Sequence, residues 1–301
     1  MKKFLLLVFL GSFTIAATAQ NEYLLYSFKG NVSVVENNAE SKAKVGRVLK
    51  ESATIKVATG GTVTLICNEV AMFSIKKAGS YSVAQFKDSC KVSSSSVSAN
   101  YVKYVWAQMT KSSGSAGSNR KYYMNTVGAV SRGGINNIWI DPRLDTVNYS
   151  GTQGLFPLSW KSYSDAEKYD FCLYTNEKGG TPIYTNTVDK LKIPITKFSD
   201  KLSPGNTYYW TAFIKGEQNE DLKIFHYVSK EKYDALVADL KKTVGAYESE
   251  AELSFRLAFL LEDAHYLSEA YEYYTKAATL APDVPLYRVT LMSFKKDYEI
   301  K

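Results

Sequence analysis

The spacing of apolar residues changes near Lys230, and this change constrains the fold more than any other feature of the sequence. Before that point, short runs of apolar and polar residues alternate, which is typical of half-buried β-strands. After it, Ala270, Tyr274 and Ala277 lie at i, i+4 and i+7, and Pro282 follows. We therefore predict a multidomain β + α protein whose helices are gathered at the C-terminal end.

Four helices are predicted within residues 230–301. Ser249 and Glu252 fit a capping box at the start of the second helix. The third helix runs from about residue 267 to residue 281, and Pro285 suits the first turn of the fourth. Each of these boundaries rests on local chemistry and needs no knowledge of the rest of the fold.

The middle two of these helices have the spacing of a helical repeat. Small side chains at Ala258, Ala270 and Ala277 let two antiparallel helices approach closely. The pattern resembles a tetratricopeptide repeat (TPR), which implies that a protein or peptide binds in its groove. His265 stands in the interhelical turn where that family has glycine, and histidine tolerates a positive φ better than most residues.

One repeat is too short to bury its own apolar faces, since solenoids need about three repeats. The TPR-like helices are therefore expected to lean on a β-domain, to self-associate or to receive a partner. This favours a non-enzymatic protein-interaction or scaffold protein that docks a protein or peptide partner. The candidate contact residues are Arg256, Tyr271, Tyr273 and Lys276. Intramolecular packing of the tyrosines and ordinary solvation of the two cations are the alternatives.

Residues 20–92 are predicted to form a small antiparallel β-domain, because several short alternating strands are separated by turn residues. Val32 and Val34 mark one strand, and Gly46 would make a turn before the strand that carries Ile55. The pattern resembles the periplasmic FecR-type domain. The cytoplasmic segment and membrane span that precede this domain in FecR itself are not expected here, so its signalling role does not carry over.

Residues 136–229 are predicted to form a second β-domain. Tyr169, Phe171 and Leu173 alternate along one strand, and Trp160 would occupy a core position. The stretch from Leu202 to Tyr208 resembles the tyrosine corner of fibronectin type III domains, in which the hydroxyl bonds back to the preceding turn. The resemblance implies a β-sandwich that acts as a spacer or adhesion module.

Residues 93–135 connect the two β-domains. Tyr101, Val102, Val105 and Met109 recur at helical spacing and predict an amphipathic helix packed on the first β-domain. A membrane-surface helix is the alternative, although its polar face has few basic residues. The serine- and glycine-rich stretch 111–119 is predicted to be a flexible loop.

Residues 1–19 are predicted to be a cleaved signal peptide, which makes the protein periplasmic or secreted and most typical of a bacterium. Lys2 and Lys3 precede an apolar stretch, and Ala17-Thr18-Ala19 has the small residues of a cleavage site. An uncleaved anchor is the alternative, and no later segment is apolar enough to span a membrane. Because the protein is exported, nucleic acid is not an expected partner, and the net charge of +7 is interpreted as favouring solubility.

The three cysteines leave two interpretations open. Cys67 and Cys90 are the natural disulfide pair in an oxidising compartment. Alternatively, Cys67 is a small core residue, because it shares a strand face with Val63 and Leu65. Cys172 lies within a predicted strand and is expected to be inert.

No catalytic activity, cofactor or metal is predicted, because neither histidine, His226 nor His265, lies in a recognisable catalytic or metal-binding arrangement. The alternative function is glycan binding or adhesion by the β-domains, with purely structural helices. Trp139 and Trp106 are its surface candidates, whereas Trp160 and Trp210 are expected to be buried.

Overall fold

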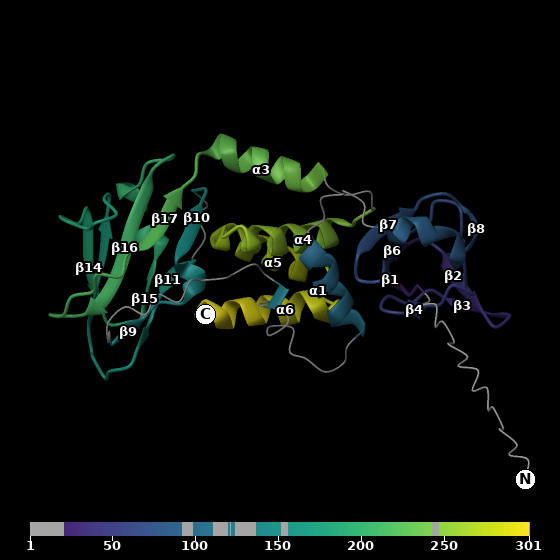
Figure 1. The fold of residues 1–301 in the computed structure, drawn as a ribbon, viewed down its shortest axis with the longest axis horizontal. Helices are drawn as coiled ribbons and strands as arrows, with labels where there is room; N and C mark the ends of the chain where they lie inside the picture. The colour runs from purple at the N-terminus through teal and green to yellow at the C-terminus, as the bar shows by residue number, and fades with distance from the viewer. Residues whose placement is uncertain are drawn as a thin grey trace, which may run out of the picture.

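The computed structural model describes residues 21–91, 99–110, 120, 122–123, 137–151, 156–242 and 247–300. The predicted signal peptide, the serine run at 93–96 and the loop at 111–119 lie outside these residues. The molecule is elongated, with the second β-domain (called the sandwich below, after its predicted fold) at one end, helices in the middle and the N-terminal β-domain at the other end (Figure 1). The predicted mixture of antiparallel β-domains and C-terminal helices is confirmed at this level.

The N-terminal β-domain consists of two four-stranded antiparallel sheets, ordered β4-β1-β6-β7 and β3-β2-β5-β8. The strands are β1 (Tyr23–Lys29), β2 (Val32–Glu36), β3 (Ala39–Lys42), β4 (Val48–Leu49), β5 (Thr54–Val57), β6 (Thr62–Cys67), β7 (Ala71–Ile75) and β8 (Gly79–Ser82). After β8, Val83 opens the 3-10 helix η1 (Val83–Cys90) and is buried there. A disulfide joins Cys67 to Cys90. Cys67 is also fully buried in the core, so both interpretations of this residue hold.

The second β-domain contains a five-stranded sheet ordered β10-β17-β16-β13-β14 and two short strand pairs, β11-β15 and β9-β12. The strands are β9 (Ile138–Trp139), β10 (Thr146–Tyr149), β11 (Pro157–Ser159), β12 (Lys161–Ser162), β13 (Tyr169–Tyr174), β14 (Tyr184–Val188), β15 (Lys192–Pro194), β16 (Thr207–Ile214) and β17 (Lys223–Tyr227). Short 3-10 helices lie at η2 (Pro142–Leu144), η3 (Ile195–Lys197) and η4 (Ser199–Lys201). The backbone N–H of Ser203 donates to the Tyr208 hydroxyl at 2.7 Å, which confirms the hydrogen bond expected of a tyrosine corner.

The helices are α1 (Ala99–Thr110), α3 (Lys230–Lys242), α4 (Glu250–Asp263), α5 (Leu267–Leu280) and α6 (Pro285–Asp297). The predicted start of α4, both predicted ends of α5 and the predicted start of α6 are confirmed to within one residue. In the capping box of α4, the Glu252 N–H donates to Ser249 Oγ, and the Ser249 N–H donates to the Glu252 carboxylate at 2.7 Å. Pro285 occupies the first turn of α6, as predicted.

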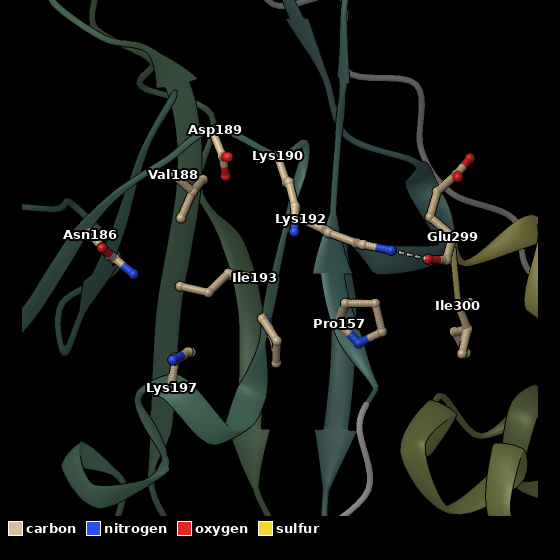
Figure 2. Close-up of a pocket in the computed structure, with 11 residues that line it drawn as sticks. Pro157, Asn186, Val188, Asp189, Lys190, Lys192, Ile193, Lys197, Glu299 and Ile300 are labelled. Carbon is tan, nitrogen blue, oxygen red and sulfur yellow. Dashed lines mark hydrogen bonds between the residues drawn. The ribbon is translucent and has the colours of Figure 1, made fainter. Parts of the chain in front are cut away.

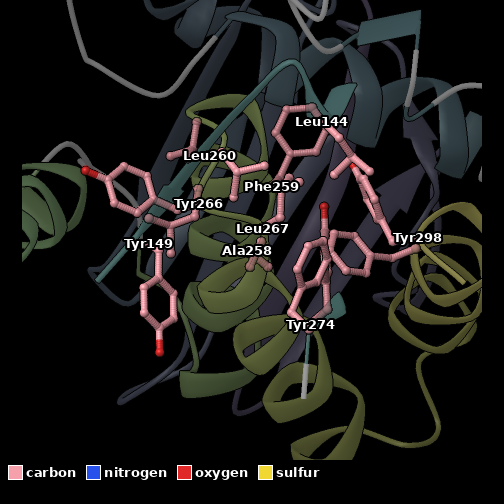
Figure 3. Close-up of a cluster of buried hydrophobic side chains, with 14 of the residues drawn as sticks. Leu144, Tyr149, Ala258, Phe259, Leu260, Tyr266, Leu267, Tyr274 and Tyr298 are labelled. Atoms are coloured by element: carbon pink, nitrogen blue, oxygen red, sulfur yellow. The ribbon is translucent and has the colours of Figure 1, made fainter. Parts of the chain in front are cut away.

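Helix α4 is buried on almost every side, because other parts of the same chain cover it. Ten of its residues are buried, including Phe255, Phe259 and Leu261. Six of the ten belong to one cluster of apolar side chains that includes residues of α1, of the other helices and of the second β-domain. Figure 3 shows part of this cluster, with Phe259 and Leu260 of α4 near Tyr149 of β10 and Tyr274 of α5. The apolar side chains of α4 are thus covered by the same chain, which is the first of the three arrangements expected from one short repeat. Leu280 of α5 and Val289 and Met292 of α6 remain exposed.

Helix α1 packs on the N-terminal β-domain, as predicted, and also on α4 and α6. The Tyr101 hydroxyl lies 2.9 Å from the Tyr26 hydroxyl of β1. The Tyr104 ring stacks on Phe259 with centroids 5.1 Å apart, and its hydroxyl lies 2.8 Å from Thr290 Oγ1 of α6. Since its apolar face is covered on both sides, α1 has no membrane-facing apolar surface in this fold.

The turn between α4 and α5 attaches the helices to the sandwich through β10. The Asn148 N–H donates to the carbonyl oxygen of His265 at 2.9 Å, and the Asn148 side chain donates to that of Ala264 at 2.9 Å. The Ser150 N–H donates to a Glu269 carboxylate oxygen at 2.6 Å. Three hydrogen bonds therefore fix the start of α5 against the end of β10.

A buried ionic network holds α4 to α6. Arg120, which is fully buried, pairs with Glu262 of α4 and Asp297 of α6. The hydroxyl of Tyr274 donates to Glu262 at 3.0 Å, and that of Tyr298 donates to it at 3.2 Å. Because buried charges are tolerated when they are paired and hydrogen-bonded, this network is a structural element of the helical core.

Replacing His265 by glycine should raise the free energy of unfolding by about 1 kcal/mol, because glycine adopts the left-handed conformation without a Cβ clash. His265 has φ +61°, and its Nδ1 is buried without a hydrogen-bond partner among the described residues. Chemical denaturation of His265→Gly and His265→Ala measures the effect. A gain in the alanine variant as large as that in the glycine variant would contradict the backbone explanation.

Candidate functional site

Arg256 does not lie on a surface and is not available to a partner, contrary to the prediction. Its side chain is 0% exposed. Its guanidinium forms a bidentate pair with Glu248, at 2.7 and 2.9 Å, and donates to the carbonyl oxygen of Leu240 at 2.8 Å. This arrangement ties the end of α3 and the segment before α4 to the centre of α4. The sequence could not distinguish a solvated helix cation from this buried pair.

The two tyrosine candidates are both half-buried, and they lie differently on α5. Tyr271 stacks on Phe294 of α6, with ring centroids 6.1 Å apart and planes at 12°. Tyr273 packs against the edge of the main apolar cluster, and burial raises its pKa. Each tyrosine therefore contributes to internal packing and keeps part of its side chain on the surface.

Lys276 lies on the surface, as predicted. Its amine forms an ion pair with Glu250 of α4 at 2.8 Å, and the two side chains remain 48% and 66% exposed. An ion pair in such contact with water contributes little to stability. The ammonium group can therefore exchange Glu250 for another carboxylate without a large loss.

A hollow of about 370 Å³ on the outer face of α5 brings two of the four candidates together. We call it the α5 hollow, and its lining consists of Tyr271, Glu272, Thr275, Lys276, Thr279 and Leu280. These residues lie at i, i+4 and i+8 in two adjacent rows, so the hollow follows the helix for about 14 Å at 1.5 Å per residue. Leu280, at one end, is 47% exposed.

The tryptophans offer less to a glycan than the sequence suggested. Trp106 is buried within α1, so its prediction as a surface residue was wrong. Trp139 is half-buried, with the Lys161 ammonium 5.2 Å above the centre of its ring. The predicted burial of Trp160 and Trp210 is confirmed. The helical spacing around Trp106 could be recognised in the sequence, but the sequence did not show that other parts of the chain cover this side chain.

A second hollow, of about 340 Å³, lies between the sandwich and the last described residues of the chain (Figure 2). We call it the lysine pocket. Its polar lining includes Lys190, Lys192 and Lys197, and its apolar lining includes Val188 and Ile193. None of these residues was predicted as a site, since the lysines are scattered through loops and short elements with no recognisable motif.

Three further findings concern metal binding, membrane spans and the third cysteine. Within the described ranges, no group of three or more histidine, cysteine or acidic residues could hold a metal ion. In the same part of the chain, no helix has the length and apolar character needed to cross a membrane. Cys172 is buried in β13 and is not disulfide-bonded.

Glu269 is a buried carboxyl group at the junction of the sandwich and the helices. One oxygen accepts from the Ser150 N–H, and the other has no hydrogen-bond partner among the described residues. Burial raises the pKa of Glu269 above its ordinary value of 4.5, and the hydrogen bonds from Ser150 only partly counteract this shift. The charged form is therefore less favourable in the folded protein than in the unfolded chain.

The Arg256→Met variant should lower the free energy of unfolding by about 3 kcal/mol or more, because it leaves the Glu248 carboxylate buried without its cation. Burial already raises the pKa of Glu248, although the hydrogen bond from Arg256 lowers it. Urea denaturation measures the loss, and Arg288→Met, which changes an exposed arginine on α6, is the control. Equal stabilities of the two variants would refute the structural role of Arg256.

The Glu269→Gln variant should change how stability depends on pH. The raised pKa means that the folded state binds the proton more tightly, so wild-type stability falls as pH rises from about 4.5 through the folded pKa. The glutamine variant lacks this loss and should gain stability relative to wild type over that window. Denaturation at a series of pH values checks this, with the exposed Asp283→Asn as control. Parallel profiles for wild type and Glu269→Gln would contradict it.

Comparison with known proteins does not assign the chain to a family. No protein-family model matches the sequence, and no curated protein matches it.

Proposed function

We propose that this protein is an exported, non-enzymatic interaction scaffold of the bacterial envelope that docks a helix of a partner protein in the α5 hollow. Its parts are a FecR-like β-domain, a fibronectin type III-like sandwich and TPR-like helices, and its location is periplasmic or secreted. The observation that carries this proposal is the hollow itself, which follows one face of α5 for about two and a half turns.

The strand order supports the fibronectin type III-like part of the proposal. The five-stranded sheet carries the tyrosine corner on β16, and the opposite layer contains the β11-β15 pair. The α4–α5 pair supports the TPR-like part, since Ala258, Ala270 and Ala277 are fully buried where the two helices approach. In a β-sandwich and a helical repeat of this kind, function resides in surfaces, so the scaffold role depends on the surface that the helices leave open.

The chemistry of the α5 hollow defines the partner. A helix laid along α5 would present side chains at i, i+4 and i+7 to the hollow, which is the usual geometry of a helix in a groove. Tyr271 and Leu280 supply apolar contact at its two ends, and Lys276 supplies a cation between them. The occupant is therefore an amphipathic helix of another protein, with apolar residues on either side of one acidic residue.

The scaffold role also depends on a fixed geometry. The helices share their core with the sandwich, and α1 connects them to the N-terminal β-domain. Removing residues 230–301 would expose the covered faces of α1 and of the sandwich, so loss of binding in such a deletion would not identify the binding surface. Point variants on the outer face of α5 avoid this difficulty.

A photo-crosslinking amino acid in place of Thr275, which is exposed in the hollow, should crosslink one partner protein in cells. Lys276→Glu should reduce the yield by about fivefold or more, because it places like charges opposite each other. Lys241→Glu, an exposed change on α3, should leave the yield unchanged. Changing the partner's acidic residue to lysine should restore crosslinking to Lys276→Glu.

Equal yields from the Lys276→Glu and Lys241→Glu proteins would overturn the proposed docking surface. A crosslinked product that consists only of two copies of this chain would show that the α5 hollow mediates self-association and does not dock a helix of another protein. Circular dichroism and thermal unfolding of each variant establish that the fold is unchanged before the yields are compared.

A further inference from the structure

The outer edge of the five-stranded sheet is formed by β14, and this edge is unprotected. β14 has the sequence Tyr-Thr-Asn-Thr-Val, with neither a charged residue nor a proline. It pairs with β13 on one side, and no other strand in the described part of the chain pairs with its opposite side. Natural edge strands usually carry lysine, proline or a bulge that prevents pairing, so this edge is chemically suited to accept another strand.

The lysine pocket adjoins this edge. Asn186 and Val188 lie two residues apart on β14, so their side chains point to the same face of the sheet, and both line the pocket. Its apolar wall also includes Ile193, Pro157 and Ile300 (Figure 2). A volume of about 340 Å³ accommodates one or two side chains of a peptide that runs beside β14.

The charge of the pocket is unbalanced. Its lining contains Lys190, Lys192 and Lys197 but two carboxylates, those of Asp189 and Glu299. The Lys192 amine donates to the backbone carbonyl oxygen of Glu299 at 2.5 Å. Figure 2 shows the Glu299 carboxylate pointing away from that amine.

Lys190 and Lys197 are both exposed, and neither forms an ion pair with a described residue. Their ammonium groups are therefore available to an incoming anion. In an extended peptide, side chains on one face recur every second residue, about 6.8 Å apart, so an apolar residue in the pocket and a carboxylate near these lysines can belong to one strand.

From these observations we infer that the sandwich binds an extended, acidic segment of a partner protein as an added strand on β14. Backbone hydrogen bonds to the β14 edge hold the segment, an apolar side chain enters the lysine pocket, and a carboxylate two residues away contacts Lys190 or Lys197. This surface is separate from the α5 hollow. The inference does not depend on the helix-docking function proposed above.

The test uses the full-length protein and a fluorescein-labelled nonapeptide that alternates valine and threonine, begins with valine and has glutamate in place of its central valine. Fluorescence anisotropy should show saturable binding. Replacing the central glutamate by lysine should weaken binding by about tenfold, as expected for the loss of a charged hydrogen bond. The double variant Lys190→Glu, Lys197→Glu should weaken binding of the glutamate peptide by a similar factor.

The matched control is Lys168→Glu, which makes the same charge change at an exposed position of the same sandwich and should bind as wild type does. The Lys276→Glu protein should also bind the peptide as wild type does. A failure of peptide binding at β14 can therefore be distinguished from a failure of helix docking in the α5 hollow. N-methylation of alternate peptide bonds tests the strand itself. One methylation register should abolish binding and the other should preserve it, since only every second residue of a strand faces its neighbour.

Three outcomes would overturn the inference. The first is the absence of saturable binding at millimolar peptide. The second is equal binding of both N-methylated peptides, which would exclude strand addition. The third is complete displacement of the peptide by acetate or inorganic phosphate at equal concentration, which would identify the lysine pocket as a site for small anions alone.

Discussion

The structure depends on the burial of α4. A helix that is apolar around most of its circumference is stable only when other elements surround it. Here α5 covers one side, and α1, α3 and α6 contribute the others, with Phe255 in ring contact with Tyr104 and Tyr287. The two buried charged residues of α4, Arg256 and Glu262, each form an ion pair. Much of the remaining arrangement follows from the need to bring these elements to one helix.

The same requirement explains why α1 lies between the two β-domains in sequence and at the centre in space. β1 is buried on both faces: Tyr23 and Leu25 point into the core of the N-terminal β-domain, whereas Leu24 and Tyr26 face the cluster that contains α1. One strand thereby belongs to two cores. The helices position the two β-domains at opposite ends of the molecule, which keeps the β14 edge far from the N-terminal β-domain (Figure 1).

Features with a local cause could be predicted from the sequence. The Ser249 cap, the positive φ of His265 and the Tyr208 hydrogen bond each depend on residues within a few positions of one another. The buried pair of Arg256 and the burial of Trp106 depend on distant segments, and helical periodicity carries no information about which segment covers a given face. β10 was missed because polar residues surround it, although Val147 and Tyr149 alternate as strand residues do.

The two apolar cores divide the molecule into two units, each of which is expected to unfold cooperatively. The N-terminal β-domain has its own cluster, from Tyr23 to Val83, and the Cys67–Cys90 disulfide lies within it. The sandwich and the helices have one cluster in common, so neither can lose its packing without exposing the other. Loss of α4 packing would therefore release α1 and the sandwich together, while leaving the core of the N-terminal β-domain covered by its own strands. The interaction surfaces proposed for α5 and β14 both lie on the larger unit, so each depends on the integrity of the same core.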